Sequence, residues 1–166
     1  MKIVILGMGN TLLTDDGIGI VIANKLHELY DDHECVDVKE TSWGGFRIID
    51  LLSEYDSAVV IDAIKTGDQP VGTIRRFKPS DFVHSVRMTA FHDINFATAL
   101  QFAKQLDIPM PEDISIYTIE VEETERISEN LTPKVQSAVE QCVGQIKNEI
   151  NGKIMNKHVI YAEEKA

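Results

Sequence analysis

Residues 1–19 read MKIVILGMGNTLLTDDGIG, and this stretch decides how the rest of the chain is interpreted. It begins with a short apolar run over residues 2–6, which ends at a glycine and is typical of a buried parallel strand. The glycines that follow allow a sharp backbone turn, and apolar residues then recur at helical spacing from residue 18. In open α/β sheets, ligands bind just outside the carboxyl ends of the strands. The stretch therefore places two adjacent carboxylates, Asp15 and Asp16, where a ligand would bind.

The same residues also allow two other interpretations. Thr14 or Asp15 is a suitable N-cap for the helix that follows, since an acid in the first turn interacts favourably with the helix dipole. The glycines at positions 7 and 9 also suggest a dinucleotide-binding loop, but Leu12 occupies the position where that motif has its third glycine. Paired carboxylates would moreover repel a pyrophosphate, so nucleotide binding remains the weaker alternative.

The composition limits the classes of function that the chain can have. The 166 residues suit one α/β domain over residues 1–152, followed by a tail over residues 153–166. A net charge of −11 disfavours nucleic-acid binding and leaves room for a basic protein partner or a cation. No apolar stretch approaches the ~20 residues that a membrane span requires, and we see no signal peptide. Cys35 and Cys142 are predicted to be reduced structural thiols, so we expect a cytoplasmic protein, and we expect it to be a monomer.

The rest of the chain alternates between predicted strands and helices. We predict strands over residues 2–6, 34–40, 57–61, 72–77 and 114–121, and helices that begin near residues 18, 46, 94 and 133. The gap between the third and fourth strands is too short for a helical crossover, so these two should run antiparallel. The last helix should begin at Thr132 and Pro133 and end at Gly152. This pattern predicts a three-layer α/β/α domain around a mixed, mostly parallel sheet of about five strands.

Three candidate site residues occupy comparable places in this predicted fold. Asp16 follows the first strand, Asp62 ends the third, and His92 opens a helix after the fourth. If the first and third strands are neighbours, the two carboxylates converge at one edge of the sheet. Two oxygens and one nitrogen suit a divalent metal such as nickel, zinc or ferrous iron. An isolated histidine at the start of a helix is, however, more often a solvated or hydrogen-bonded residue.

Residues 7–19, residues 60–63 and a His92 followed by a helix resemble the hydrogenase maturation endopeptidase family. The likeness extends from residue 1 to about residue 151 and includes the helix start at Leu131-Thr-Pro133. Members of that family remove a C-terminal extension from the large subunit of nickel-iron hydrogenases after nickel insertion, and their fold is a five-stranded twisted mixed sheet between helices. The resemblance implies that Asp16, Asp62 and His92 are catalytic and metal-binding, that the partner is a large-subunit precursor, and that the substrate supplies the nickel.

One loop departs from the family pattern. Many members carry Asp-Gly-Gly-Thr-x-Gly after the second strand, whereas this chain reads ETSWGG over residues 40–45, with Trp43 where threonine is common. This change leaves open which hydrogenase is the substrate, and Trp43 is equally consistent with a core residue packed on Phe46.

The reaction mechanism also stays open at this point. No serine or cysteine has a histidine and acid at a spacing that would make it a nucleophile, which leaves metal-assisted or carboxylate-assisted hydrolysis. A non-catalytic, nickel-sensing chaperone of the large subunit would need the same three ligands and is the rival interpretation. Acidic residues lie around residues 28–37, around residues 112–129 and in the tail, and they could attract a basic segment of the partner. Solvated acidic faces without a partner role are, however, commoner.

Overall fold

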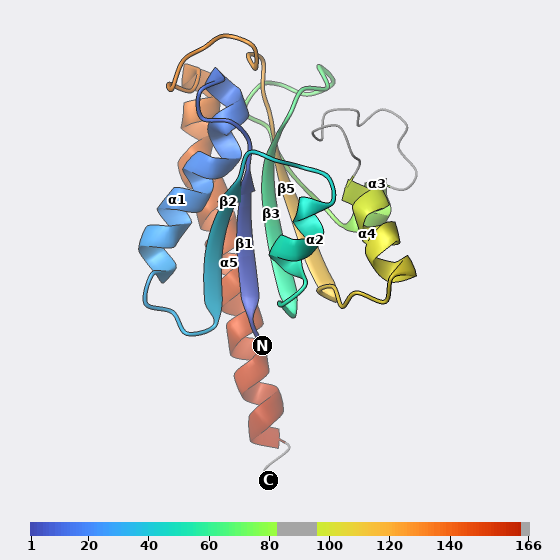
Figure 1. Ribbon diagram of the computed structural model, residues 1–166. Helices are drawn as coiled ribbons and strands as arrows, with labels where there is room; N and C mark the ends of the chain where they lie inside the picture. Colours follow the sequence, from blue (N-terminus) through green and yellow to red (C-terminus); the bar gives the residue numbers. More distant parts are fainter. Residues whose placement is uncertain (83–95, 164–166) are drawn as a thin grey trace.

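The computed structural model describes residues 1–82 and 96–163, and these form a five-stranded sheet flanked by helices (Figure 1). The strands are β1 (Ile3–Met8), β2 (Val36–Thr41), β3 (Ser57–Ile64), β4 (Ile74–Phe77) and β5 (Asp113–Glu120). The helices are α1 (Ile18–Tyr30), α2 (Arg47–Leu52), α3 (Pro79–Phe82), α4 (Phe96–Gln105) and α5 (Pro133–Glu163), and a 3-10 turn, η1 (Thr14–Gly17), precedes α1. None of these helices combines the length and the apolar character that a membrane span requires.

The sheet has the strand order β2-β1-β3-β5-β4, in which only β4 runs antiparallel to its neighbour. The prediction that the first and third strands are neighbours is confirmed, as is the mixed, mostly parallel sheet. The fourth strand runs opposite to the third as predicted, but the two are not paired, because β5 lies between them. The connection from β3 to β4 crosses the end of β5, where the Gly72 N–H donates to the Glu120 carbonyl (2.8 Å) and the Glu120 N–H donates to the Thr73 carbonyl (2.9 Å).

Two hydrophobic cores lie on opposite faces of the sheet. One lies under α1 and α5 and contains Val59 and Ile61 of β3, and the other lies under α2 and α4 and contains Ala58 and Val60 of the same strand. This alternation is what a strand buried on both faces requires. The predicted three-layer α/β/α architecture is therefore confirmed (Figure 1).

The glycines of the first segment allow α1 to pack closely on the sheet. A Cβ atom on Gly19 would overlap the carbonyl oxygens of Met8 and Ile61, so only glycine permits this approach of helix to strands. A Cβ atom on Gly7 would likewise overlap the backbone of Gly19 and the side chain of Ala23. Packing of this kind explains both glycines without any bound nucleotide.

The prediction that the last helix ends at Gly152 is wrong, because α5 continues without a break to Glu163. Glycine inside a helix costs about 1 kcal/mol relative to alanine, which packing on both sides can offset. Ile150 is fully buried before the glycine, and the Lys153 ammonium lies 2.9 Å from both the Asp113 and the Glu149 carboxylates after it. No break in the helix therefore falls at the boundary predicted between residues 1–152 and 153–166.

Candidate functional site

Asp16 is positioned by a tight turn at the carboxyl end of β1. Gly9 has a φ of +135°, and a Cβ atom there would overlap the Asp16 carbonyl oxygen, so the chain needs a glycine at this position. The Leu13 N–H donates to the Asn10 carbonyl (3.0 Å), and the Asp16 N–H donates to the Leu13 carbonyl (3.1 Å). These contacts hold the partly buried Asp16 beside the end of β1.

Asp15 is fully buried and has a structural role that differs from the predicted one. Its carboxylate accepts hydrogen bonds from the Thr132 N–H (2.7 Å), the Thr132 hydroxyl (3.0 Å) and the Glu123 N–H (3.3 Å). The prediction that Thr14 or Asp15 caps the first helix is wrong, since neither η1 nor α1 has a side-chain cap hydrogen bond. The Asp15 carboxylate instead satisfies donors just before α5, and it ties that helix to the first loop.

Asp62 is the second predicted site carboxylate, and it is 1% exposed. It lies inside β3 rather than at its end, because Ala63 and Ile64 continue the strand. Oδ1 accepts a hydrogen bond from the Ala63 N–H (2.8 Å), whereas the buried Oδ2 has no hydrogen-bond partner among the described residues. Burial raises the pKa of Asp62 well above its ordinary value, and the nearby charge of Asp16 raises it further against the opposing effect of the Ala63 N–H. The two carboxylates therefore lie close enough for their charges to interact.

The third predicted ligand, His92, lies outside the described residues. Within residues 1–82 and 96–163, no group of three His, Cys, Asp or Glu side chains is placed to hold a metal ion. The described part of the site thus consists of two interacting carboxylates. The open Oδ2 of Asp62 suits a divalent cation, because a cation would offset both its burial and the repulsion from Asp16.

Thr118 of β5 lies next to Asp62 in register on the neighbouring strand. It is fully buried, and its hydroxyl has no hydrogen-bond partner among the described residues. The sequence places Thr118 on one face of the strand with Ile114 and Ile116, but it assigns no function to the residue. The available signal was a hydroxyl on a strand face that is otherwise apolar at these positions.

Glu120 comes two residues after Thr118 and is buried, but it has a full set of partners. Its carboxylate accepts hydrogen bonds from the Thr66 N–H (2.7 Å), the Thr66 hydroxyl (2.8 Å), the Gly67 N–H (2.8 Å) and the Arg75 guanidinium (3.1 Å). The residue therefore anchors the connection between β3 and β4. This role is structural.

Trp43 lies at the rim of the same edge of the sheet. A cavity of about 400 Å³ opens beyond the end of β2, and its lining is Thr11, Ile20, Asn24, Glu40, Thr41, Ser42, Trp43 and Arg47. Trp43 is 70% exposed, so its interpretation as a core residue packed on Phe46 is wrong. The ring of Phe46 packs instead on Phe102 of α4, with 4.7 Å between centroids. An exposed tryptophan at the wall of a cavity is a feature of binding surfaces.

Fold and site together define an α/β/α domain with a pair of carboxylates, one beside the end of β1 and one within β3 just before its end, an arrangement suited to cation-assisted or carboxylate-assisted hydrolysis. The family model described as "HycI: Hydrogenase maturation protease" matches residues 20–149, and the chain belongs to this family of peptidases. The matched range contains Asp62 and His92 and begins just after Asp16.

Curated relatives and solved structures agree with this assignment. The chain is 25% identical over 150 residues to the hydrogenase 2 maturation protease of Escherichia coli K12, which covers 88% of each chain. It is 25% identical over 159 residues to the coenzyme F420 hydrogenase subunit delta of Methanothermobacter thermautotrophicus, covering 90% of this chain and 94% of that one. The fold is similar to that of the E. coli hydrogenase maturating endopeptidase HybD, with a TM-score of 0.73, 24% identity and coverage of 92% and 94%. It is also similar to HybD from Thermococcus kodakarensis, with a TM-score of 0.67, 22% identity and coverage of 89% and 98%.

Proposed function

We propose that this protein removes a C-terminal extension from the large-subunit precursor of a nickel-iron hydrogenase after nickel has been inserted. Membership of the hydrogenase maturation protease family supports the reaction class. The single structural observation that carries the proposal is the buried Asp62 carboxylate, which interacts with Asp16 and has an oxygen without a partner among the described residues. A folded protein keeps such a costly group where it has a use.

In this proposal the nickel is part of the substrate, and the site recognises it. Asp62 is held rigidly by β3 and presents Oδ2, and Asp16 is brought to the same place by the η1 turn. His92 is the proposed third ligand. The nickel of loaded precursor, bound between the carboxylates, offsets their mutual repulsion. Nickel-free precursor brings no cation and leaves this repulsion in place. Either the bound nickel or one of the carboxylates then activates the water that cleaves the peptide bond.

Two further properties belong to the proposal. The free cysteines Cys35 and Cys142 are typical of a reducing compartment, which supports a cytoplasmic enzyme. The net charge of −11 supports attraction of a basic segment of the precursor, and the exposed Trp43 at the cavity rim supports a direct contact with it. We expect the enzyme to act on the precursor as a monomer.

The test is incubation of the protein with nickel-loaded and nickel-free precursor, followed by mass spectrometry of the precursor. Loaded precursor should become shorter at its C-terminus, and nickel-free precursor should keep its mass. Equal cleavage of the two would contradict recognition of nickel. Stable binding of loaded precursor without any change of mass would contradict cleavage and favour the chaperone interpretation.

A further inference from the structure

Three polar residues form a row across neighbouring strands beside the proposed site. Asp62 of β3 lies opposite Thr118 of β5, and Thr118 lies opposite Arg75 of β4. Side chains at directly opposite positions point to the same face of a sheet. That face is the one covered by α2 and α4. Val60 of β3 and Ile116 of β5 lie two residues before Asp62 and Thr118, on the same face, and both belong to the core under these helices.

Each residue of this row has a buried polar atom without a hydrogen-bond partner among the described residues. The atoms are Asp62 Oδ2, Thr118 Oγ1 and Arg75 Nε. A buried polar group without a partner costs about 1–3 kcal/mol, so natural structures contain few of them. Three such atoms on adjacent strands, beginning at the proposed site carboxylate, indicate that a ligand satisfies them together.

The chemistry of the row indicates what kind of ligand fits. Thr118 Oγ1 and Arg75 Nε can each donate a hydrogen bond, so together they suit an oxygen that accepts two. The guanidinium of Arg75 is held in place, because its Nη2 lies 3.1 Å from the Glu120 carboxylate and its Cζ lies 5.4 Å from the ring centroid of Phe77. Donors that are fixed in advance and buried from water are those that best stabilise a developing negative charge.

We propose that Thr118 Oγ1 and Arg75 Nε bind the carbonyl oxygen of the scissile peptide bond and hold the oxyanion formed from it. This inference rests on the proposed peptidase function and adds two catalytic residues to it. The oxygen of a water molecule attacks the carbonyl carbon, and the electron pair of the C=O double bond moves to the oxygen, where Thr118 and Arg75 donate to it. When the C=O bond re-forms, the C–N bond breaks, and the proton from the water reaches the leaving nitrogen by way of the site carboxylates.

The test is a matched pair of substitutions at Thr118. Thr118→Val removes the hydroxyl and keeps the shape of the side chain, whereas Thr118→Ser keeps the hydroxyl. Loss of one oxyanion donor lowers kcat by about 10²–10³-fold in other hydrolases, and we expect a loss of that size for Thr118→Val with little change in KM. Thr118→Ser should stay within a few-fold of wild type. Because Thr118→Val removes a hydroxyl that has no partner among the described residues, its midpoint of thermal unfolding should equal or exceed that of the wild type.

Three outcomes would overturn the inference, and all use loaded precursor that the wild-type protein cleaves. One is a wild-type kcat in Thr118→Val, and another is a loss of activity that follows a lowered unfolding midpoint in both Thr118 variants. If Thr118→Val does not fold, Arg75→Lys is measured instead, because lysine keeps the positive charge beside Glu120 and lacks the Nε donor. A wild-type kcat in Arg75→Lys would be the third outcome that overturns the inference. Failure of the wild-type protein to cleave loaded precursor would instead contradict the proposed function itself.

Discussion

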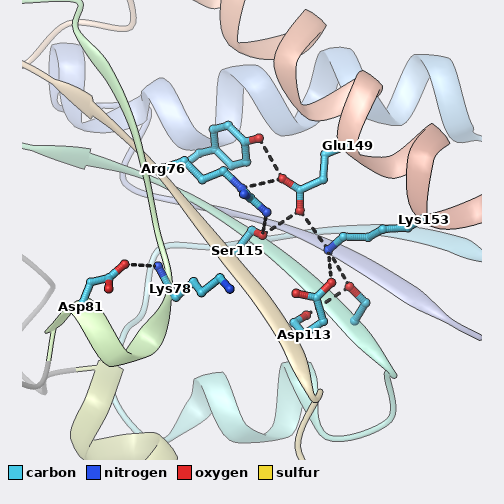
Figure 2. A network of polar contacts seen from close by, with 9 residues as sticks. Arg76, Lys78, Asp81, Asp113, Ser115, Glu149 and Lys153 are labelled. Atoms are coloured by element: carbon cyan, nitrogen blue, oxygen red, sulfur yellow. Dashed lines mark hydrogen bonds and ion pairs between the residues drawn. The ribbon is translucent and has the colours of Figure 1, made fainter. Parts of the chain in front are cut away.

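Two carboxylates on opposite faces of the same sheet, the buried Asp62 and the largely covered Glu149, differ sharply in the number of donors around them. Glu149 lies on α5 beneath one face, and its carboxylate is surrounded by donors (Figure 2). They are the Ser115 hydroxyl (2.7 Å), the Tyr117 hydroxyl (2.9 Å), the Arg76 guanidinium (2.7 Å) and the Lys153 ammonium (2.9 Å). Asp62 faces the other side, and the Ala63 N–H is its one hydrogen-bond donor within residues 1–82 and 96–163.

The pKa values of the two groups move in opposite directions for this reason. Burial raises the pKa of Asp62 well above its ordinary value. Burial would also raise the pKa of Glu149, but the hydrogen bonds from Ser115 and Lys153, the charge of Lys153 and the hydrogen bond from Tyr117 outweigh it and lower the pKa to about 2. Asp15 and Glu120 resemble Glu149 in their hydrogen bonding alone, since the carboxylate of each accepts from several donors. Of the four carboxylates compared, Asp15, Glu120 and Glu149 have several donors and hold the fold together, whereas Asp62 has an oxygen without a partner among the described residues and is the candidate for chemistry.

The largest effect that tests this contrast is expected at the site itself. Asp62→Asn should reduce processing of nickel-loaded precursor below about one-hundredth of the wild-type rate, because the site loses an anionic ligand or base. The unfolding midpoint should not fall, since burial disfavours the charged form of Asp62 and the Asn side-chain oxygen can still accept from the Ala63 N–H. Asp16→Ala should abolish processing in the same way. A marked loss of stability in Asp62→Asn would place Asp62 with the structural carboxylates and so break the contrast.

Glu149→Ala should show the reverse behaviour. It leaves Arg76 and Lys153 without their common carboxylate. Because the Arg76 side chain is 48% exposed, we expect a loss of about 2 kcal/mol of unfolding free energy, less than a fully buried pair would cost. Folded enzyme should keep its processing rate, because Tyr117 of the network lies on the face under α1 and α5, whereas Asp62 lies on the other face. Urea unfolding measures the loss, and Glu140→Ala is the matched control on the same helix, since Glu140 pairs with Lys25 at an exposed position and should change stability little.

Much of this arrangement could be predicted from the sequence, because it depends on local patterns. Continuous apolar runs, which are typical of strands buried on both faces, predicted the parallel sheet. The position of Asp62 directly after Val60 and Ile61 predicted a carboxylate near the sheet edge. The partners of Asp15 could not be predicted, because Thr132 and Glu123 come from a connector more than a hundred residues away. The open hydroxyl of Thr118 likewise depends on which strand lies beside β5.

The neighbouring acids Asp15 and Asp16 allow a finer test at adjacent positions. Asp15→Ala removes the acceptor for two donors of Thr132 and one of Glu123, and hydrogen bonds to a charged group contribute about 1.5–3 kcal/mol, so we expect a loss of about 2 kcal/mol of unfolding free energy. Processing by the folded variant should fall less than in Asp16→Ala. Measurement of unfolding free energy and processing rate in both variants separates a structural role of Asp15 from a catalytic role of Asp16. If Asp15 proved essential for processing and Asp16 dispensable, the two roles would be reversed.

The smallest effect is expected in the acid limb of the stability curve. A carboxyl whose pKa is lowered on folding, from an ordinary 4.5 to about 2 for Glu149, stabilises the folded state fully above about pH 4.5. That contribution is lost progressively as the pH falls toward 2, because the unfolded chain binds the proton more readily. Glu149→Gln cannot titrate, so the difference in urea midpoint between wild type and this variant should be constant from pH 7 to 5 and shrink between pH 4.5 and 3. A difference in urea midpoint that stays constant down to pH 3 would show that the donors around Glu149 do not stabilise the charged form of its carboxylate.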